Sequence, residues 1–120
     1  MKEDNDNLIA VESKAFAIRY IKLYQHLTEN KREFVLCKQL LRSGTSIGAN
    51  VKEALRGQSK ADFGTKMNIA LKEASESEYW LELLFETDYL STEGFESMME
   101  DCKRIIRILT AIVKSTFQGR

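Results

Sequence analysis

The stretch LRSGTSIGAN, residues 41–50, decides the fold of this 120-residue chain. Its two glycines, two serines and threonine are typical of a loop. Yet seven residues keep one helical phase across it, at intervals of three and four: Phe34, Cys37, Leu41, Gly44, Gly48, Val51 and Leu55. A loop at residues 43–48 would have no reason to preserve that phase. We therefore predict a single helix over residues 31–56, with a loop at residues 43–48 as the alternative.

The two glycines need a physical reason if they lie inside a helix. Each glycine destabilises a helix interior by about 1 kcal/mol relative to alanine. Gly44 and Gly48 are four residues apart and share one face, so close approach of a neighbouring helix would offset that loss. The stretch is not a phosphate-binding P-loop, because only three residues separate the glycines and Ala49 follows the second. We predict that both glycines are helix-packing residues.

Three further stretches have apolar residues at helical spacing: residues 14–27, 60–89 and 93–117. The turns between them are short, so consecutive helices must run antiparallel. We predict an all-α protein, an antiparallel up-down-up-down four-helix bundle over residues 13–118. Residues 1–12 are expected to be an extended or frayed segment before it.

Polar residues at the predicted turns mark the helix ends. Ser13 and Ser59 are candidate N-caps, since a serine hydroxyl can accept a hydrogen bond from a free backbone N–H. Asn30 and Glu33 resemble a capping box that opens the second helix. Gly57 suits the position just after that helix ends.

The composition is that of a globular protein, with 43% hydrophobic and 30% charged residues. No apolar run approaches the roughly 20 residues of a membrane span, and the acidic start MKEDNDN has no secretory signal behind it. Cys37 and Cys102 are the only cysteines, and neither has metal-type partners nearby. We expect a cytoplasmic protein with two reduced, structural cysteines and no membrane partner.

A net charge of zero hides an uneven distribution of charge along the chain. Residues 14–60 contain ten Lys or Arg and three Asp or Glu, whereas residues 73–101 contain ten Asp or Glu and no Lys or Arg. Such asymmetry indicates complementary packing between helices or subunits, or a basic face for a partner.

Basic residues follow one face of the predicted second helix: Lys31, Lys38, Arg42, Lys52 and Arg56. A stripe of this kind can contact nucleic-acid phosphates, so the candidate nucleic-acid-binding residues are Lys38, Arg42, Lys52 and Arg56. No aromatic residues for base stacking are interleaved with them. The alternative is a solvated face, or salt bridges to the acidic third helix.

The sequence offers no convincing catalytic or metal site. The segment ALKEASESEYW brings Glu73 and Glu76 close together, but a di-metal bundle site needs Glu-x-x-His pairs and His26 is the only histidine. The same lack of histidine argues against a serine nucleophile. Ion pairs with Arg42, or with a basic face of another subunit, explain the acids better. We expect no metal, no cofactor and no catalytic residue, and so not an enzyme.

Two blocks of sequence, QLLRSGTSIGANV and ALKEASESEYW, carry a family resemblance. They resemble the four-helix-bundle proteins encoded in intervening sequences of bacterial 23S rRNA genes, the so-called S23 ribosomal proteins. The resemblance covers about residues 13–115, although SKAFAIR near the start matches the family pattern only in part. It implies an up-down bundle that assembles into homopentameric rings, and it provides no catalytic residues to transfer.

A similar bundle is the accessory protein of diversity-generating retroelements, which works with a reverse transcriptase and nucleic acid. The resemblance therefore implies as partners further copies of the chain, and RNA or a nucleic-acid-processing protein. Two functions remain open at this point. One is a nucleic-acid-binding accessory module, and the other is a structural or scaffolding oligomer that binds another protein.

Overall fold

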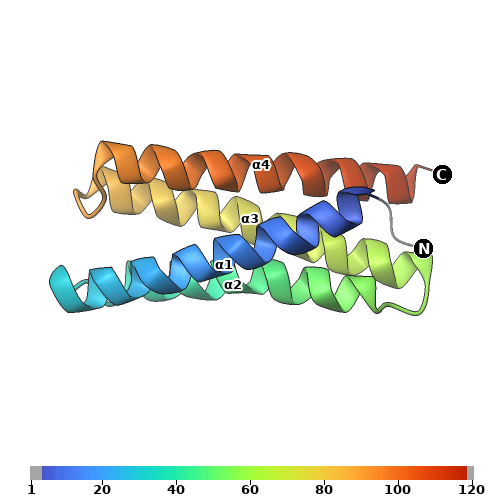
Figure 1. Cartoon of the computed structure of the whole chain (residues 1–120), viewed down its shortest axis with the longest axis horizontal. Coiled ribbons are helices and arrows are strands. Elements are labelled where there is room, and N and C mark those ends of the chain that lie inside the picture. The colour runs from blue at the N-terminus through green and yellow to red at the C-terminus, as the bar shows by residue number, and fades with distance from the viewer. Residues whose placement is uncertain (1–3, 119–120) are drawn as a thin grey trace.

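The computed structural model describes residues 4–118, which form an elongated bundle of four helices about 46 Å long (Figure 1). The helices are α1 (Asp4–Asn30), α2 (Leu36–Leu55), α3 (Lys60–Glu86) and α4 (Thr92–Phe117). Each packs against two neighbours: α1 against α2 and α4, and α3 against α2 and α4. Within the described residues the diagonal pairs do not pack on each other. The predicted all-α, up-down-up-down four-helix bundle is confirmed.

Helix α2 runs without interruption through residues 43–48, so the loop alternative is wrong. Two of the three hydroxyl groups that suggested a loop form hydrogen bonds inside the helix. Thr45 Oγ1 donates to the carbonyl of Leu41 at 2.7 Å, and Ser43 Oγ donates to that of Leu40 at 3.2 Å. Such back-bonding lets small polar residues occupy a helix interior.

The two glycines of α2 have different surroundings. A Cβ added at Gly44 would lie 1.5 Å from Cδ2 of Tyr20, because the tyrosine ring of α1 rests on the glycine backbone. A Cβ added at Gly48 would lie 3.5 Å from its nearest neighbour, the carbonyl oxygen of Ser13, which is an ordinary contact. Close approach of the two helices therefore requires glycine at 44 and merely tolerates it at 48.

The start of α2 differs from the prediction, because the helix begins at Leu36 and not at residue 31. Helix α1 continues to Asn30. Arg32 then adopts a left-handed conformation with φ of 55°, in the turn that leads into α2. Asn30 and Glu33 do not form a capping box. Instead, the Glu33 carboxylate alone accepts hydrogen bonds from the N–H groups of Val35, Leu36 and Cys37, at 3.2, 2.9 and 2.8 Å.

The electrostatics of Glu33 fit this capping role. Burial disfavours its charged form, but the backbone hydrogen bonds from Leu36, Cys37 and Val35 outweigh burial and lower the pKa of the carboxyl group. A negative charge at the start of a helix is also stabilised by the helix dipole. The carboxylate is therefore ionised at neutral pH and holds the first turn of α2.

The start of α1 is a second correction, because α1 begins at Asp4 and the segment from residue 4 to residue 12 is helical. Residues 1–3 of the expected extended segment lie outside the described residues. Ser13 is no N-cap but a buried residue inside α1, whose hydroxyl donates to the carbonyl of Ala10. Two features explain why the helix starts earlier than predicted. Asp4 and Asp6 are favourable in its first turn, and Ile9 extends its buried face toward the N-terminus.

The remaining helix ends follow recognised capping patterns. The hydroxyls of Ser59 and Ser91 accept hydrogen bonds from the third backbone N–H after each, both at 3.0 Å, and cap α3 and α4. Helix α3 stops at Glu86, not at residue 89. Asp88 takes a left-handed conformation with φ of 70°, and the N–H of Tyr89 donates to the carbonyl of Leu84, which forms a Schellman motif.

Candidate nucleic-acid interface

The four candidate residues of α2 share the face that points away from the core. At 100° per residue, Lys38, Arg42, Lys52 and Arg56 fall within an arc of about 80°. All four are exposed, whereas Ile47 on the opposite face is fully buried. The amphipathic pattern of α2 thus builds a basic outer face, which we name the α2 stripe. Lys31 lies in the turn before α2 and is not part of it.

Within residues 4–118, Arg42 is the one member of the α2 stripe with acidic partners. Its guanidinium lies 3.4 Å from Glu73 Oε2 and also contacts Glu76 Oε1, both on α3. Trp80 Nε1 donates to the same oxygen of Glu76 at 3.2 Å, which fixes that carboxylate. Partial burial works against the charge of Arg42, but Glu73 and Glu76 outweigh it and raise its pKa. Two of the three acids of ALKEASESEYW, Glu73 and Glu76, therefore form interhelical ion pairs with Arg42.

Lys38, Lys52 and Arg56 make no ion pair or side-chain hydrogen bond to the described part of the chain. Glu53, the acid nearest to this end of the stripe in sequence, pairs with Lys66 of α3 at 2.9 Å. Three of the four predicted residues thus offer free positive charge on a single helix face.

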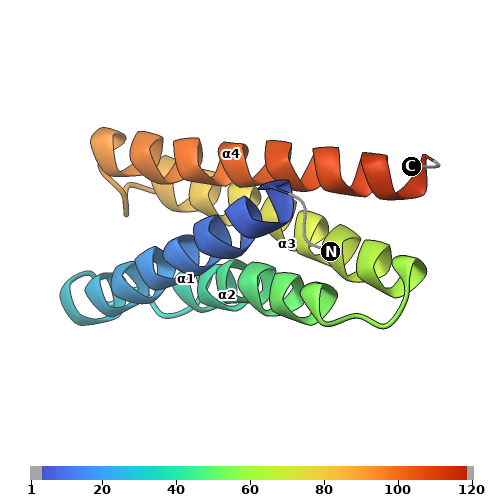
Figure 2. The same ribbon diagram turned by 45° about the vertical axis from the view of Figure 1, so that its right-hand side comes forward.

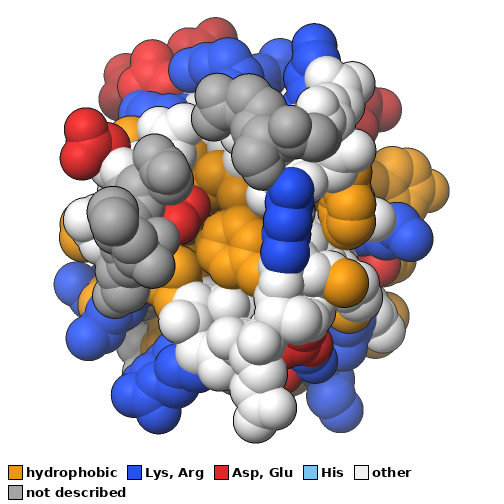
Figure 3. All heavy atoms as spheres, turned by 90° about the vertical axis from the view of Figure 1, so that its right-hand side faces the viewer, with side chains coloured by type: hydrophobic (Ala, Val, Ile, Leu, Met, Phe, Trp, Pro, Cys, Tyr) orange, Lys and Arg blue, Asp and Glu red, His pale blue; other side chains and the backbone are white. Residues whose placement is uncertain are grey.

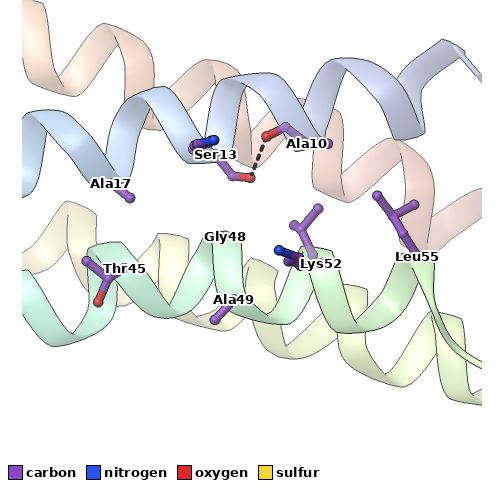
Figure 4. A pocket seen from close by; sticks show the side chains of 10 residues that line it. Ala10, Ser13, Ala17, Thr45, Gly48, Ala49, Lys52 and Leu55 are labelled. Atoms are coloured by element: carbon purple, nitrogen blue, oxygen red, sulfur yellow. Dashed lines mark hydrogen bonds between the residues drawn. The ribbon is translucent and has the colours of Figure 1, made fainter.

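A groove of about 460 Å³ runs beside the α2 stripe, between the first half of α1 and the second half of α2. It opens because the two helices diverge toward this end of the bundle (Figure 2). Small side chains line it from both helices, among them Ala10, Ala17, Gly48 and Ala49 (Figure 4). Its two lysines come from different walls, Lys14 from α1 and Lys52 from α2, and no acidic residue lines it. We name it the α1/α2 groove.

Sequence reasoning missed both Lys14 and the groove. Lys14 lies 38 residues before Lys52, and nothing in the sequence indicates that the two face each other across a gap. At the end of the bundle where α2 finishes, Lys and Arg side chains, with some Asp and Glu among them, surround a small exposed hydrophobic area (Figure 3). Lys14 shows that basic residues at this end are not confined to α2.

The two cysteines are buried, and the pKa of each thiol is raised. Burial and the neighbouring Glu33 raise the pKa of Cys37 to about 11, and burial together with Glu78 raises that of Cys102 to about 12. Both cysteines are free and buried, so their thiols stay protonated at neutral pH. His26 Nδ1 lies at hydrogen-bonding distance, 2.9 Å, from Nδ2 of Asn30. Across residues 4–118, no group of three His, Cys, Asp or Glu could hold a metal ion.

Each helix in the described part of the chain is too polar to cross a membrane.

Comparison with known proteins places this geometry in a family. The profile described as 23S rRNA-intervening sequence protein matches residues 5–111. A crystal structure of a protein of unknown function from the S23 ribosomal protein family of Bacteroides thetaiotaomicron is 52% identical in sequence. The match covers 92% of this chain and 98% of that one, with a TM-score of 0.90. Comparison with curated proteins gives no significant match. The chain belongs to the 23S rRNA-intervening sequence protein family.

Proposed function

We propose that this protein is a non-enzymatic, homo-oligomeric helical bundle of the bacterial cytoplasm that binds the phosphate backbone of RNA through the α2 stripe. Five subunits are proposed on the strength of the family resemblance. The proposed role is that of an accessory module, which holds nucleic acid and performs no chemistry on it.

One observation carries the nucleic-acid proposal. Lys38, Lys52 and Arg56 project from one face of α2 without acidic partners, while the acids nearby are engaged by Arg42 and Lys66. Unpaired cations in a row can displace counterions from a phosphate backbone, which favours binding at low salt. The link of the family to intervening sequences of 23S rRNA is a further reason to choose RNA as the probe.

The test is a salt series of binding to single-stranded and structured RNA, with wild type compared to the double variant K38A/R56A. Lys52 is left unchanged because it also lines the α1/α2 groove. Each lost phosphate contact should reduce the log–log salt slope by about 0.7 for a single strand, so the double variant should show a slope flatter by about 1.4. Its affinity should fall alike for all sequences.

The matched control is K103A/R107A, which removes the same charge from α4. Both side chains are exposed, make no ion pair among the described residues and lie on the helix diagonal to α2. This control should keep the wild-type slope. Equal slopes for wild type and K38A/R56A, or equal losses in both variants, would refute the stripe as the contact.

A scaffold that binds another protein is the second candidate. It is favoured by the pairing of Arg42 with α3, which removes one cation from the stripe, and by the exposed apolar residues on the outer face of α1. If wild type fails to bind RNA even at low salt, the scaffold takes the place of the nucleic-acid module.

A further inference from the structure

We infer that the α1/α2 groove is a self-assembly site that receives the outer face of α3, centred on Tyr79, from a second copy of the chain. The inference rests on the homo-oligomer proposed above and names its contact surfaces. Nucleic-acid binding is not needed for it.

The receiving surface is apolar and open. Small side chains, among them Ala10, Ala17, Gly48 and Ala49, leave room between the two helices. Helix α1, which forms one wall, also exposes Val11, which is 67% exposed and takes no part in the core, although it does not line the groove itself. Lys14 and Lys52, without acidic partners in the described chain, add positive charge on both walls.

The matching surface lies on α3. Tyr79 is 54% exposed, and its ring lies tilted against that of the neighbouring Trp80, at 5.3 Å between ring centroids. Glu82 and Glu86 follow it within an arc of about 60° on the same outer face. Both are exposed and, like Glu78 beside the tyrosine, form no ion pair within residues 4–118. An exposed tyrosine followed along its face by two unpaired acids complements a small-residue groove between two lysines.

The other exposed apolar residues outside α1 fit the groove less well. They are Phe34, Val35, Ile69 and Phe117. Phe34 and Val35 follow two basic residues, Ile69 lies between two lysines one turn away on each side, and Phe117 follows a lysine. Docking Phe34, Val35 or Phe117 would bring positive charge onto Lys14 and Lys52. Docking Ile69 would bring Lys72, since Lys66 is engaged by Glu53. Charge thus selects the surface around Tyr79.

The two surfaces are separate, because α1 and α2 form the groove whereas Tyr79, Glu82 and Glu86 lie on α3. One copy therefore uses its groove for one neighbour and its α3 face for another. Such a head-to-tail contact between unlike surfaces repeats from copy to copy and closes into a ring when the rotation permits.

The experiment is light scattering on charge-reversed variants of the full chain at micromolar concentration, with circular dichroism to verify folding. Wild type should have a mass several times the 13.8 kDa of one chain. K14E/K52E, which makes the groove acidic, and E82K/E86K, which makes the α3 face basic, should each raise the dissociation concentration at least tenfold. The combined variant K14E/K52E/E82K/E86K should regain the wild-type mass, because both surfaces are reversed together.

Two further variants sharpen the result. Y79A should weaken assembly at least tenfold while Y79F should not, because the ring and not the hydroxyl fills the groove. K103E/R107E changes the same charge on α4 and should assemble like wild type. If K14E/K52E or E82K/E86K keeps the wild-type mass, this interface is refuted but the proposed homo-oligomer is not. A monomeric wild type would overturn the interface and the proposed oligomer together, whatever the RNA-binding result.

Discussion

The contact between Tyr20 and Gly44 predicts that G44A and G48A change the free energy of unfolding in opposite directions. In G44A the new methyl group would lie 1.5 Å from the Tyr20 ring, where about 3.5–4.0 Å is needed for contact. The ring must therefore retreat by about 2 Å. It is 1% exposed and packs on Phe16 at 4.1 Å between ring centroids, so no open space receives it.

The magnitudes favour net destabilisation of G44A. Overpacking of a core site costs about 1–3 kcal/mol, and a clash this short belongs at the upper end. Replacement of glycine by alanine inside a helix contributes about 1 kcal/mol in the other direction. The free energy of unfolding of G44A should thus fall by about 2 kcal/mol. G48A meets only ordinary contacts, so its free energy of unfolding should rise by about 0.5–1 kcal/mol.

The assay is urea unfolding followed by circular dichroism, at the same protein concentration for every variant because self-association adds to apparent stability. A third arm uses Y20A, which costs about 3–5 kcal/mol by itself but removes the ring. In that background G44A should become stabilising. The reasoning is refuted if G44A unfolds within 0.5 kcal/mol of wild type, or if G48A loses as much stability as G44A.

Two further outcomes follow from the buried titratable groups. E33Q should lower the free energy of unfolding at pH 7 by about 1–2 kcal/mol, because a charged cap of three N–H groups becomes a neutral one. The pKa of Glu33 is lowered by folding, so its contribution is complete above the pKa of the unfolded chain and is lost as the pH falls through the folded value. The gap between wild type and E33Q should therefore close in acid unfolding series below about pH 4. Cys37 and Cys102 should resist a disulfide reagent at pH 7.5 in the native protein and react with two equivalents in urea; rapid native labelling would contradict their raised pKa values and burial.

The continuity of α2 could be predicted because periodicity is a property of the whole segment. A phase kept from Cys37 to Leu55 outweighs the local loop preference of glycine and serine at residues 43–48. The helix ends were harder to predict, because they depend on which of several capping groups acts. Glu33 looked like one half of a capping box but caps α2 alone, and Ser13 looked like a cap but is buried in α1.

The candidate site was predicted in part for a related reason. Residues of one helix can be placed on a common face from their spacing, so the α2 stripe was visible in the sequence. Which residues of the α2 stripe are free to bind a partner could not be predicted. The pairing of Arg42 with Glu73 and the gap between Lys14 and Lys52 depend on how separate helices meet. The same limit applies to the glycines, whose difference arises entirely from the position of Tyr20 on another helix.

At the Tyr20–Gly44 contact, the ring of Tyr20 lies directly against the backbone of α2. Toward the groove the two helices separate from this point, and Lys52 lies eight residues further along α2, about 12 Å at the rise of an α-helix. A larger side chain at residue 44 would push α1 and α2 apart at this contact and change their crossing angle. The two walls of the groove would then move relative to each other. Residue 44 would then control the spacing of Lys14 and Lys52 without contacting a second copy itself. A substitution about two turns before Lys52 could therefore alter assembly.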